Sequence, residues 1–126
     1  MLIILVLIVS ALVRFYNNTA LALWHDEAFS ALYIRYPWGE MMERIGLDVH
    51  PPLYYWVLRI WSYGAGDSLL SLRLLSIIFG VLTVWAGYMF LRAAWGKRVA
   101  FLGALLLAIN PFQIQYALEA RMYTLG

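Results

Sequence analysis

RLLSIIFGVLTVWAGYMFLR, residues 73–92, sets the architecture expected of this chain. Between its two arginines runs a charge-free stretch of about 18 residues, the length that an α-helix needs to cross the hydrocarbon core of a bilayer. Arg92, Lys97 and Arg98 then crowd a short connection, and a second apolar stretch follows at residues 99–109. The pattern predicts a transmembrane helix followed by a second helix that returns across the membrane.

The composition of the whole chain places it among membrane proteins. Of its 126 residues, 64% are hydrophobic, 17% aromatic and 13% charged, and the mean hydropathy is +0.76. Soluble domains use about 45–50% apolar residues, so too few polar positions remain here to cover a water-facing surface. A net charge of +2, carried by scattered basic residues, argues against a nucleic-acid partner. Because the chain has no Cys, it has no disulfides or thiolate metal sites.

The amino-terminal stretch predicts another spanning helix. Residues 1–13 are apolar apart from Ser10, and we expect the helix to continue toward Tyr16, with the Arg14 side chain reaching the membrane surface. A signal peptide is disfavoured, because no basic region precedes the apolar stretch and no clear small-residue cleavage site follows it. Residues 17–67 hold six of the seven acids, both histidines and three of the four prolines, which predicts a loop outside the bilayer core.

The expected architecture is an all-α, polytopic transmembrane domain of which the chain supplies the amino-terminal portion. In chain order we expect spans at about 1–16, 69–92 and 98–110, a large loop at 17–67, and the start of a further helix at about 115. The basic connection at 92–98 is expected in the cytoplasm by the positive-inside rule. The large loop and the region at 110–119 would then share the opposite, extracytoplasmic face.

Amphipathic juxtamembrane helices are expected within the large loop. Apolar residues recur at helical spacing at Phe29, Leu32, Tyr33 and Tyr36. Asp26 is placed to cap this helix and Pro37 to end it. A second short helix would carry Glu40 and Arg44 as an i,i+4 pair. The aromatic stretch at 52–63 predicts a third helix lying at the membrane interface, broken by the glycines that follow it.

Two adjacent carboxylates, Asp26 and Glu27, stand beside Trp24 at the end of an apolar segment. A helix cap and a first-turn acid favoured by the helix dipole would explain such a pair in structural terms alone. A general base is the functional interpretation, since partial desolvation at a membrane surface makes a carboxylate more basic. The two interpretations are compatible, and we predict that both residues are catalytic.

Other side chains suit the binding of a phosphate or a sugar. Arg73 lies about one turn inside its helix, where snorkelling would explain it, yet ionisable groups in membrane segments are functional candidates and a guanidinium matches a phosphate. His50 precedes two prolines that favour a turn, and it can also donate a hydrogen bond to a phosphate or sugar. Glu119 and Arg121 are two residues apart, so on a helix they would face separate partners.

Five motifs, in order and at similar spacing, resemble a known family. They are Leu23-Trp24-His25-Asp26-Glu27-Ala28-Phe29-Ser30, His50-Pro51-Pro52-Leu53-Tyr54-Tyr55, Leu72-Arg73-Leu74-Leu75-Ser76 with Gly80, Asn110-Pro111 with Tyr116, and Glu119-Ala120-Arg121-Met122-Tyr123. They are similar to the amino-terminal part of the GT-C membrane glycosyltransferases of the dolichyl-phosphate-mannose–protein mannosyltransferase superfamily. The similarity is best to the bacterial branch that includes the aminoarabinose transferase of lipid A, and it covers nearly the whole chain from about Leu21.

The resemblance implies a reaction and a role for individual residues. Such enzymes move a sugar from a polyprenyl-phosphate carrier to a hydroxyl acceptor, and we expect inversion at the sugar. Asp26 matches the first-loop aspartate that acts on the acceptor. His50 and Arg73 match positions near the donor phosphate, and Tyr54 belongs to the same substrate-binding stretch as His50.

The resemblance leaves two features open. In some relatives a second acid follows the arginine of the last helix, whereas here Glu119 precedes Arg121, so the role of this acid departs from the pattern. Metal use varies across the superfamily, which keeps a divalent metal as a candidate cofactor. The sequence itself has no clear cluster of metal ligands, so we assign no metal-binding residue.

The sequence therefore predicts a multi-pass glycosyltransferase of the inner or plasma membrane. Its partners would be a polyprenyl-phosphate-linked sugar donor, a hydroxyl-bearing acceptor and the lipid bilayer, and not nucleic acid. The alternative is a non-enzymatic membrane module, such as a fragment of a transporter or of an assembly subunit. Transporters place ionisable residues near the midplane on broken helices. Here the acids cluster in one loop, which favours the enzyme.

Overall fold

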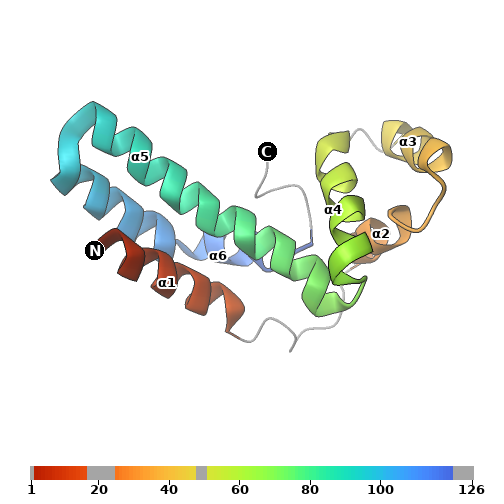
Figure 1. Ribbon diagram of the computed structural model, residues 1–126, viewed down its shortest axis with the longest axis horizontal. Helices are drawn as coiled ribbons and strands as arrows, with labels where there is room; N and C mark the ends of the chain where they lie inside the picture. The colour runs from red at the N-terminus through yellow and green to blue at the C-terminus, as the bar shows by residue number, and fades with distance from the viewer. Residues whose placement is uncertain (1, 17–24, 48–50, 121–126) are drawn as a thin grey trace.

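The computed structural model describes residues 2–16, 25–47 and 51–120, with residues 25 and 26 described by their backbone only. These ranges contain helices and no strand (Figure 1), so the predicted all-α class is confirmed for them. The helices are, in chain order, α1 (Leu2–Phe15), α2 (His25–Tyr33), α3 (Trp38–Leu47), α4 (Pro52–Ala65), α5 (Leu69–Ile109) and α6 (Pro111–Ala117).

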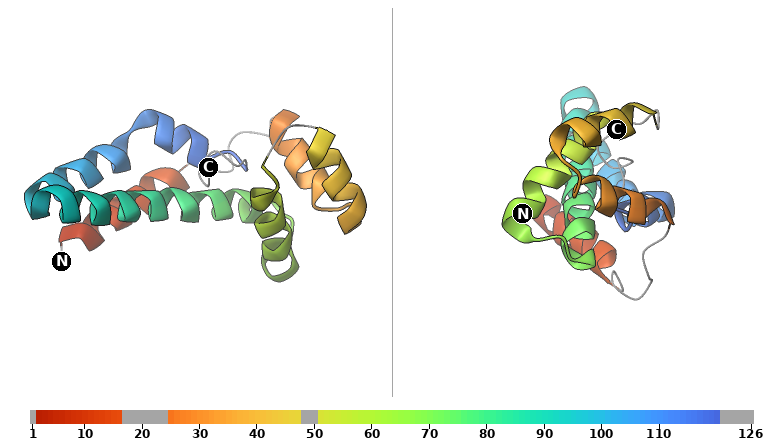
Figure 2. Two further views of the ribbon diagram at one scale, coloured as in Figure 1. Left: turned by 90° about the horizontal axis from the view of Figure 1, so that it is seen from above. Right: turned by 90° about the vertical axis from the view of Figure 1, so that its right-hand side faces the viewer.

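α5 consists of two helical arms joined by a sharp turn at Gly96. This residue has φ 84° and ψ 178°, a non-helical conformation that residues with a Cβ rarely adopt. The chain turns back there, and the two arms run side by side in opposite directions (Figures 1 and 2). The turn lies inside the basic connection that the sequence places between its two expected helices.

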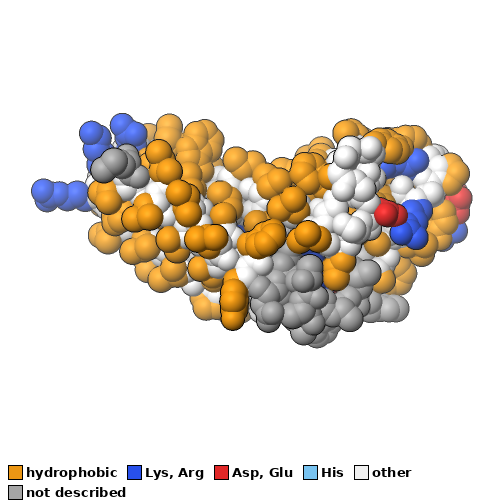
Figure 3. Space-filling model, turned by 60° about the horizontal axis from the view of Figure 1, so that its bottom comes forward, with side chains coloured by type: hydrophobic (Ala, Val, Ile, Leu, Met, Phe, Trp, Pro, Cys, Tyr) orange, Lys and Arg blue, Asp and Glu red, His pale blue; other side chains and the backbone are white. Residues whose placement is uncertain are grey.

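One helix of the described ranges, α5, is long and apolar enough to cross a membrane. Its arm before Gly96 is about 40 Å long at 1.5 Å per residue, more than the roughly 30 Å of a hydrocarbon core. α1 is also apolar but has only 14 residues. Figure 3 shows apolar side chains over the middle of the molecule and charged side chains gathered at its two ends. Arg92, Lys97 and Arg98, which flank the turn, are all exposed.

α1 packs against both arms of α5. Val6 of α1, Val84 of the first arm, and Ala104 and Ala108 of the second arm form one buried cluster. Small residues on the second arm let the three helices approach closely, which is how helices commonly pack in membranes. These contacts hold the carboxyl end of α1 beside the carboxyl end of α5.

Arg14 does not reach the membrane surface, so this part of the sequence-based prediction is wrong. Its side chain is fully buried. The guanidinium donates hydrogen bonds to Ser10 Oγ at 2.7 Å and to the carbonyl oxygen of Ala108 at 3.0 Å. The second arm of α5 ends beside Arg14 and offers the carbonyl of Ala108, which residues near Arg14 in the sequence do not reveal.

α2 begins at His25 and buries only part of the face expected, since Tyr33 is buried. Asp26 therefore lies within the first turn and not at the N-cap, which corrects the predicted capping role. Phe29 and Leu32, expected on the inner face, are 38% and 45% exposed. The buried residues of this segment are Glu27, Ser30, Tyr33 and Ile34. The buried side also carries Glu27, which binds Arg73 inside the molecule.

α3 and α4 follow the predicted pattern. Arg44 Nη2 lies 2.8 Å from Glu40 Oε1, as expected for the i,i+4 pair, and this hydrogen bond raises the pKa of Arg44. Pro52 is the first residue of α4, and the N–H of Gly66 closes the helix on the carbonyl of Ser62 at 3.0 Å. α4 is amphipathic: it buries Tyr54, Tyr55 and Leu58 and exposes Leu53, Trp56, Ile60 and Tyr63.

Asn110 separates two helices, since α5 ends at Ile109 and α6 begins at Pro111. The Asn110 side chain accepts hydrogen bonds from two backbone N–H groups in the first turn of α6, at 3.0 and 3.2 Å. α6 ends at Ala117, and the next three residues form a turn and bend. The further helix that the sequence predicts from about residue 115 would run into residues 121–126, which lie outside the described part of the chain. Within the described part, the N–H of Ala120 binds the carboxylate of Glu27.

α2, α3 and α4 gather at the end of α5 that lies opposite the Gly96 turn (Figure 2). They enclose the main core of the described residues: Tyr33, Ile34, Met41, Ile45, Tyr54, Tyr55, Leu58, Leu72, Leu75 and Ala120. The indole N–H of Trp61 binds the carbonyl oxygen and Oγ of Ser71, at 3.0 and 3.1 Å, which fixes α4 to the start of α5. This core positions the polar residues described next.

Candidate active site

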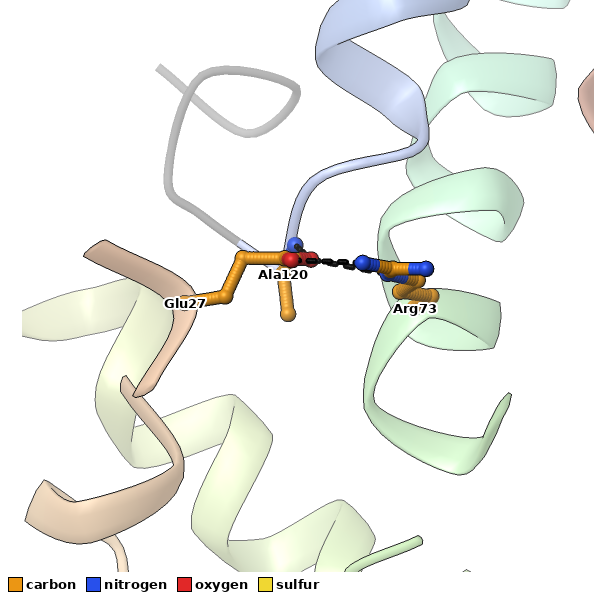
Figure 4. Close-up of polar contacts among 3 residues, drawn as sticks. All are labelled: Glu27, Arg73 and Ala120. Atoms are coloured by element: carbon orange, nitrogen blue, oxygen red, sulfur yellow. Dashed lines mark hydrogen bonds and ion pairs between the residues drawn. The ribbon is translucent and has the colours of Figure 1, made fainter. Parts of the chain in front are cut away.

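A buried ion pair joins α2 to α5. Arg73 Nε donates to Glu27 Oε1 at 2.9 Å, and Arg73 Nη2 donates to Glu27 Oε2 at 2.6 Å (Figure 4). The side chains are only 4% and 1% exposed. Two parallel hydrogen bonds of this kind fix both the distance and the plane of the guanidinium. The predicted catalytic Glu27 and the predicted phosphate-binding Arg73 are therefore direct partners.

A third donor completes this arrangement from a distant part of the chain. The backbone N–H of Ala120 donates to Glu27 Oε1 at 2.9 Å (Figure 4). Burial of two charges carries a desolvation cost that close geometry and additional hydrogen bonds offset. The carboxylate of Glu27 thus connects three elements: α2, the start of α5 and the segment after α6.

Local sequence explains why each charge can occupy its place. Glu27 lies in the first turn of α2, where the helix dipole favours a negative charge. Arg73 lies near the start of α5, which is capped by Ser68 because its side chain accepts the N–H of Ser71 at 3.2 Å. α4 then packs over the same face of α5. The pair is consequently enclosed at the amino ends of two helices.

Tyr54 lies beside the ion pair through a second polar contact. Its hydroxyl is 3.0 Å from Ser76 Oγ, and both residues are buried. Ser76 follows Arg73 by three residues, so the two share one face of α5. Tyr55 packs against the ring of Tyr54 at a centroid distance of 5.8 Å and against Tyr33 at 5.6 Å. These aromatic side chains separate Arg73, Ser76 and the Tyr54 hydroxyl from water.

Ser30 is a buried polar residue that sequence analysis did not single out. It follows Glu27 by three residues on the buried face of α2, and its side chain is fully buried. Its hydroxyl has no hydrogen-bond partner among the described residues. Ser76 and the N–H of Ala120 were also missed. Ser76 has a signal in its spacing from Arg73, whereas a backbone N–H leaves none in the sequence.

The remaining predicted residues fall into two groups. Glu119 is half-buried and adjoins Ala120, so the described structure brings it to the same segment as the ion pair. Asp26 adjoins Glu27 in the first turn of α2, and its side chain lies outside the described part of the chain. His50 and Arg121 also lie outside the described residues.

No group of three or more His, Asp or Glu side chains within the described ranges is arranged as a set of metal ligands. Among the described side chains, Arg73 supplies the positive charge at this site, and the carboxylate of Glu27 balances it. A guanidinium held at a fixed angle is suited to the recognition of a phosphate or carboxylate group.

Comparison with known proteins identifies the family. Residues 49–124 match the family described as dolichyl-phosphate-mannose-protein mannosyltransferase, and this range is more than half of the chain. No curated protein and no solved structure matches the chain. The matched range contains Tyr54, Arg73 and Glu119, whereas Glu27 precedes it. The chain with this buried Glu–Arg site thus belongs to the dolichyl-phosphate-mannose-protein mannosyltransferase family.

Proposed function

We propose that this protein transfers a sugar from a polyprenyl-phosphate carrier to a hydroxyl group on a protein, lipid or glycan. The family suggests a membrane glycosyltransferase of the GT-C type. The observation that carries the more specific proposal is the buried Glu27–Arg73 pair at one end of an apolar helical hairpin. A donor with a phosphate and a lipid tail suits both features, because it needs a guanidinium and an apolar surface close together.

Arg73 is assigned to the donor phosphate, and Glu27 is assigned to holding Arg73 in place. Both oxygens of the Glu27 carboxylate accept hydrogen bonds from the guanidinium, and one also accepts the N–H of Ala120. A carboxylate engaged in this way is well placed to orient the arginine. The role of general base therefore falls to Asp26, which adjoins Glu27 in the first turn of α2.

The reaction is a displacement at the anomeric carbon of the sugar. The carboxylate of Asp26 takes the proton of the acceptor hydroxyl, and the acceptor oxygen forms the new bond to the anomeric carbon. The bond between that carbon and the phosphate oxygen breaks, and polyprenyl phosphate leaves with the electron pair. A single displacement inverts the configuration of the sugar.

Negative charge accumulates on the departing phosphate. Arg73 stabilises this charge, with help from His50 and Arg121, and such stabilisation is strong in a site that excludes water. Tyr54 and Glu119 contribute to the binding of the sugar or phosphate. Tyr54 is supported in this role by its hydrogen bond to Ser76, which follows Arg73 by three residues on α5.

The site is assigned to the extracytoplasmic face of the inner or plasma membrane, in a multi-pass protein of the bacterial, aminoarabinose-transferase-like branch. Exposed Arg92, Lys97 and Arg98 at the opposite end of the hairpin support this orientation, because basic residues favour the cytoplasmic side. A transporter is less well supported. The described Glu27–Arg73 pair lies at an end of the hairpin and not near its middle, where transporters bind their ions.

The test is the transfer activity of the purified full-length protein carrying Asp26→Asn. The assay supplies a polyprenyl-phosphate-linked sugar and a hydroxyl acceptor, chosen by comparing the glycolipids and glycoproteins of cells with and without the gene. Loss of the base should lower turnover by roughly 10²–10⁴-fold, because the acceptor must then attack without proton removal. Expression and donor binding should change little.

Asp67→Asn is the matched control. Asp67 pairs with Arg35 at 2.7 Å in an exposed position, outside the proposed site, so its loss should leave turnover nearly unchanged. Near-normal transfer by the Asp26→Asn enzyme would overturn the assigned mechanism. If the normal protein transfers no sugar from any polyprenyl-phosphate donor, the proposed function itself is wrong.

A further inference from the structure

Arg14 occupies a site that is unusual for a buried cation. It is fully buried, and within the described part of the chain no carboxylate pairs with it. Its guanidinium is held by oxygen atoms of helices: Ser10 Oγ at 2.7 Å, the carbonyl of Ala108 at 3.0 Å and the carbonyl of Leu107 at 3.4 Å. Such a costly arrangement requires a physical reason.

The reason is the interruption between α5 and α6. In a continuous helix the carbonyl of Leu107 would accept the N–H of residue 111, but that residue is Pro111 and has no N–H. The carbonyl of Ala108 would accept the N–H of Phe112, which instead binds Asn110 Oδ1 at 3.0 Å. Arg14 binds both of these carbonyl groups, in addition to the carbonyl of Ser10 in its own helix.

The helix dipole adds to the same effect. The second arm of α5 ends at Ile109, and the carboxyl end of a helix carries a partial negative charge that favours a cation. Arg14 therefore supplies both the donors and the charge that the broken helix end lacks. It acts as a side-chain cap contributed by another helix.

Close packing makes the junction rigid. A Cβ placed on Gly80 would lie 3.0 Å from Arg14 Nε and 3.0 Å from the Cβ of Ala117. Gly80 thus allows α1, the first arm of α5 and α6 to meet at one point. It also explains why Arg14 Nε has no hydrogen-bond partner among the described residues, since α5 covers that edge of the guanidinium.

The junction leads directly to the candidate active site. α6 ends at Ala117, and three residues later the N–H of Ala120 binds Glu27, which in turn holds Arg73. The direction in which α6 leaves α5 consequently determines where the N–H of Ala120 lies. Arg14 fixes that direction from a helix that does not contact the ion pair through any described hydrogen bond.

We infer that Arg14 is a positioning residue: by capping the carbonyls freed at Asn110–Pro111, it holds α6 so that Ala120 aligns the Glu27–Arg73 pair. The catalytic consequence rests on the proposed function, whereas the structural coupling does not. Arg14 touches no substrate in this mechanism. Its loss should therefore act on turnover through the geometry of the segment at 118–120.

The experiment compares Arg14→Met with the normal full-length protein by two independent measurements. The first is the kcat and KM of sugar transfer, in which kcat should fall by roughly 10–100-fold, since small displacements of catalytic groups have effects of this size. The second is the rate at which a thiol reagent labels a Leu118→Cys reporter in a background without other cysteines. That rate should rise severalfold, because the segment loses its anchor and opens more often.

A second substitution makes the test specific to the freed carbonyls. Arg14→Lys keeps a cation and N–H donors for the freed carbonyls, so it should retain part of the activity and part of the protection that Arg14→Met loses. Ser10→Ala is the matched control: it removes one acceptor of Arg14 and exposes no carbonyl, so kcat and labelling should change little. Retention of both readouts by Arg14→Lys supports the inference.

Two results would overturn it. One is unchanged labelling of the Leu118→Cys reporter in an Arg14→Met protein that is folded. The other is labelling of the reporter as fast in the Arg14→Lys protein as in the Arg14→Met protein. If the normal protein proves inactive on polyprenyl-phosphate donors, the proposed function fails, while the labelling results still decide whether Arg14 controls the segment at 118–120.

Discussion

At the scale of single residues, burial changes what a charged side chain does. Glu27 and Arg73 are 1% and 4% exposed, and their contact is shorter and more enclosed than the surface pair of Arg35 and Asp67, whose side chains are 63% and 54% exposed. A buried pair must be kept intact, because the loss of one member leaves the other charge without compensation in a poorly polar interior.

This contrast predicts the outcome of a double-mutant cycle. Glu27→Gln and Arg73→Gln should each lower the free energy of unfolding by roughly 3–5 kcal/mol, since each leaves a buried charge without its partner. The double variant should cost less than the sum, because no uncompensated charge remains. Thermal and denaturant unfolding in detergent measures these differences.

Asp67→Asn provides the control for that cycle. It breaks an exposed pair, so unfolding should change by at most about 1 kcal/mol. Additive effects of the two buried substitutions, or single effects as small as that of the control, would show that the pair is not coupled as the structure indicates.

At the scale of helices, a Cβ added to glycine would have opposite effects on backbone stability at two positions, Gly96 and Gly64. Gly96 has φ 84°, and the turn between the arms of α5 depends on that conformation. Gly64 lies inside α4, and nothing lies within 4 Å of the position that its Cβ would occupy. A methyl group at the first position introduces backbone strain, whereas at the second it favours the helix.

Alanine substitutions at the two glycines should therefore differ in sign. Gly96→Ala should destabilise the protein by about 1–2 kcal/mol, the cost of a Cβ in a left-handed conformation. Gly64→Ala should be neutral or stabilising by up to about 1 kcal/mol. Unfolding temperatures of the two variants in detergent decide the question, and equal shifts would contradict the assigned turn.

At the scale of the whole molecule, charge is separated along its length. Arg92, Lys97 and Arg98 are exposed around the Gly96 turn of α5. α2, α3 and α4, with the candidate active site, lie at the other end (Figure 2). The apolar hairpin between them contains the candidate span. Such a molecule has one orientation in which the basic end faces the cytoplasm.

Thiol labelling tests this orientation. In a background without other cysteines, a membrane-impermeant maleimide added to intact cells should label Glu43→Cys on α3 and spare Ala94→Cys near the turn. Both positions are exposed in the structure, so access depends on the side of the membrane and not on burial. Permeabilised cells should show labelling of both. Labelling of Ala94→Cys alone in intact cells would reverse the proposed orientation.

The sequence by itself determined the features that depend on near neighbours. The helix formed by the charge-free run at 74–91, the i,i+4 pair of Glu40 and Arg44, and the interruption at Asn110–Pro111 are all local, and each is present in the structure. Helix formation and its ends follow from residues within one or two turns. The family resemblance rested on such local motifs, and the match over residues 49–124 confirmed it at the level of the family.

Only the tertiary structure decided which polar groups meet. Glu27 binds Arg73 across 46 residues and the N–H of Ala120 across 93, and Arg14 binds the carbonyl of Ala108 across 94. No spacing rule connects such distant positions, and one of the donors is a backbone group that any residue would supply. A buried carboxylate must be paired, and the partners of Glu27 come from distant parts of the chain, so the local apolar pattern of α2 does not identify its buried face.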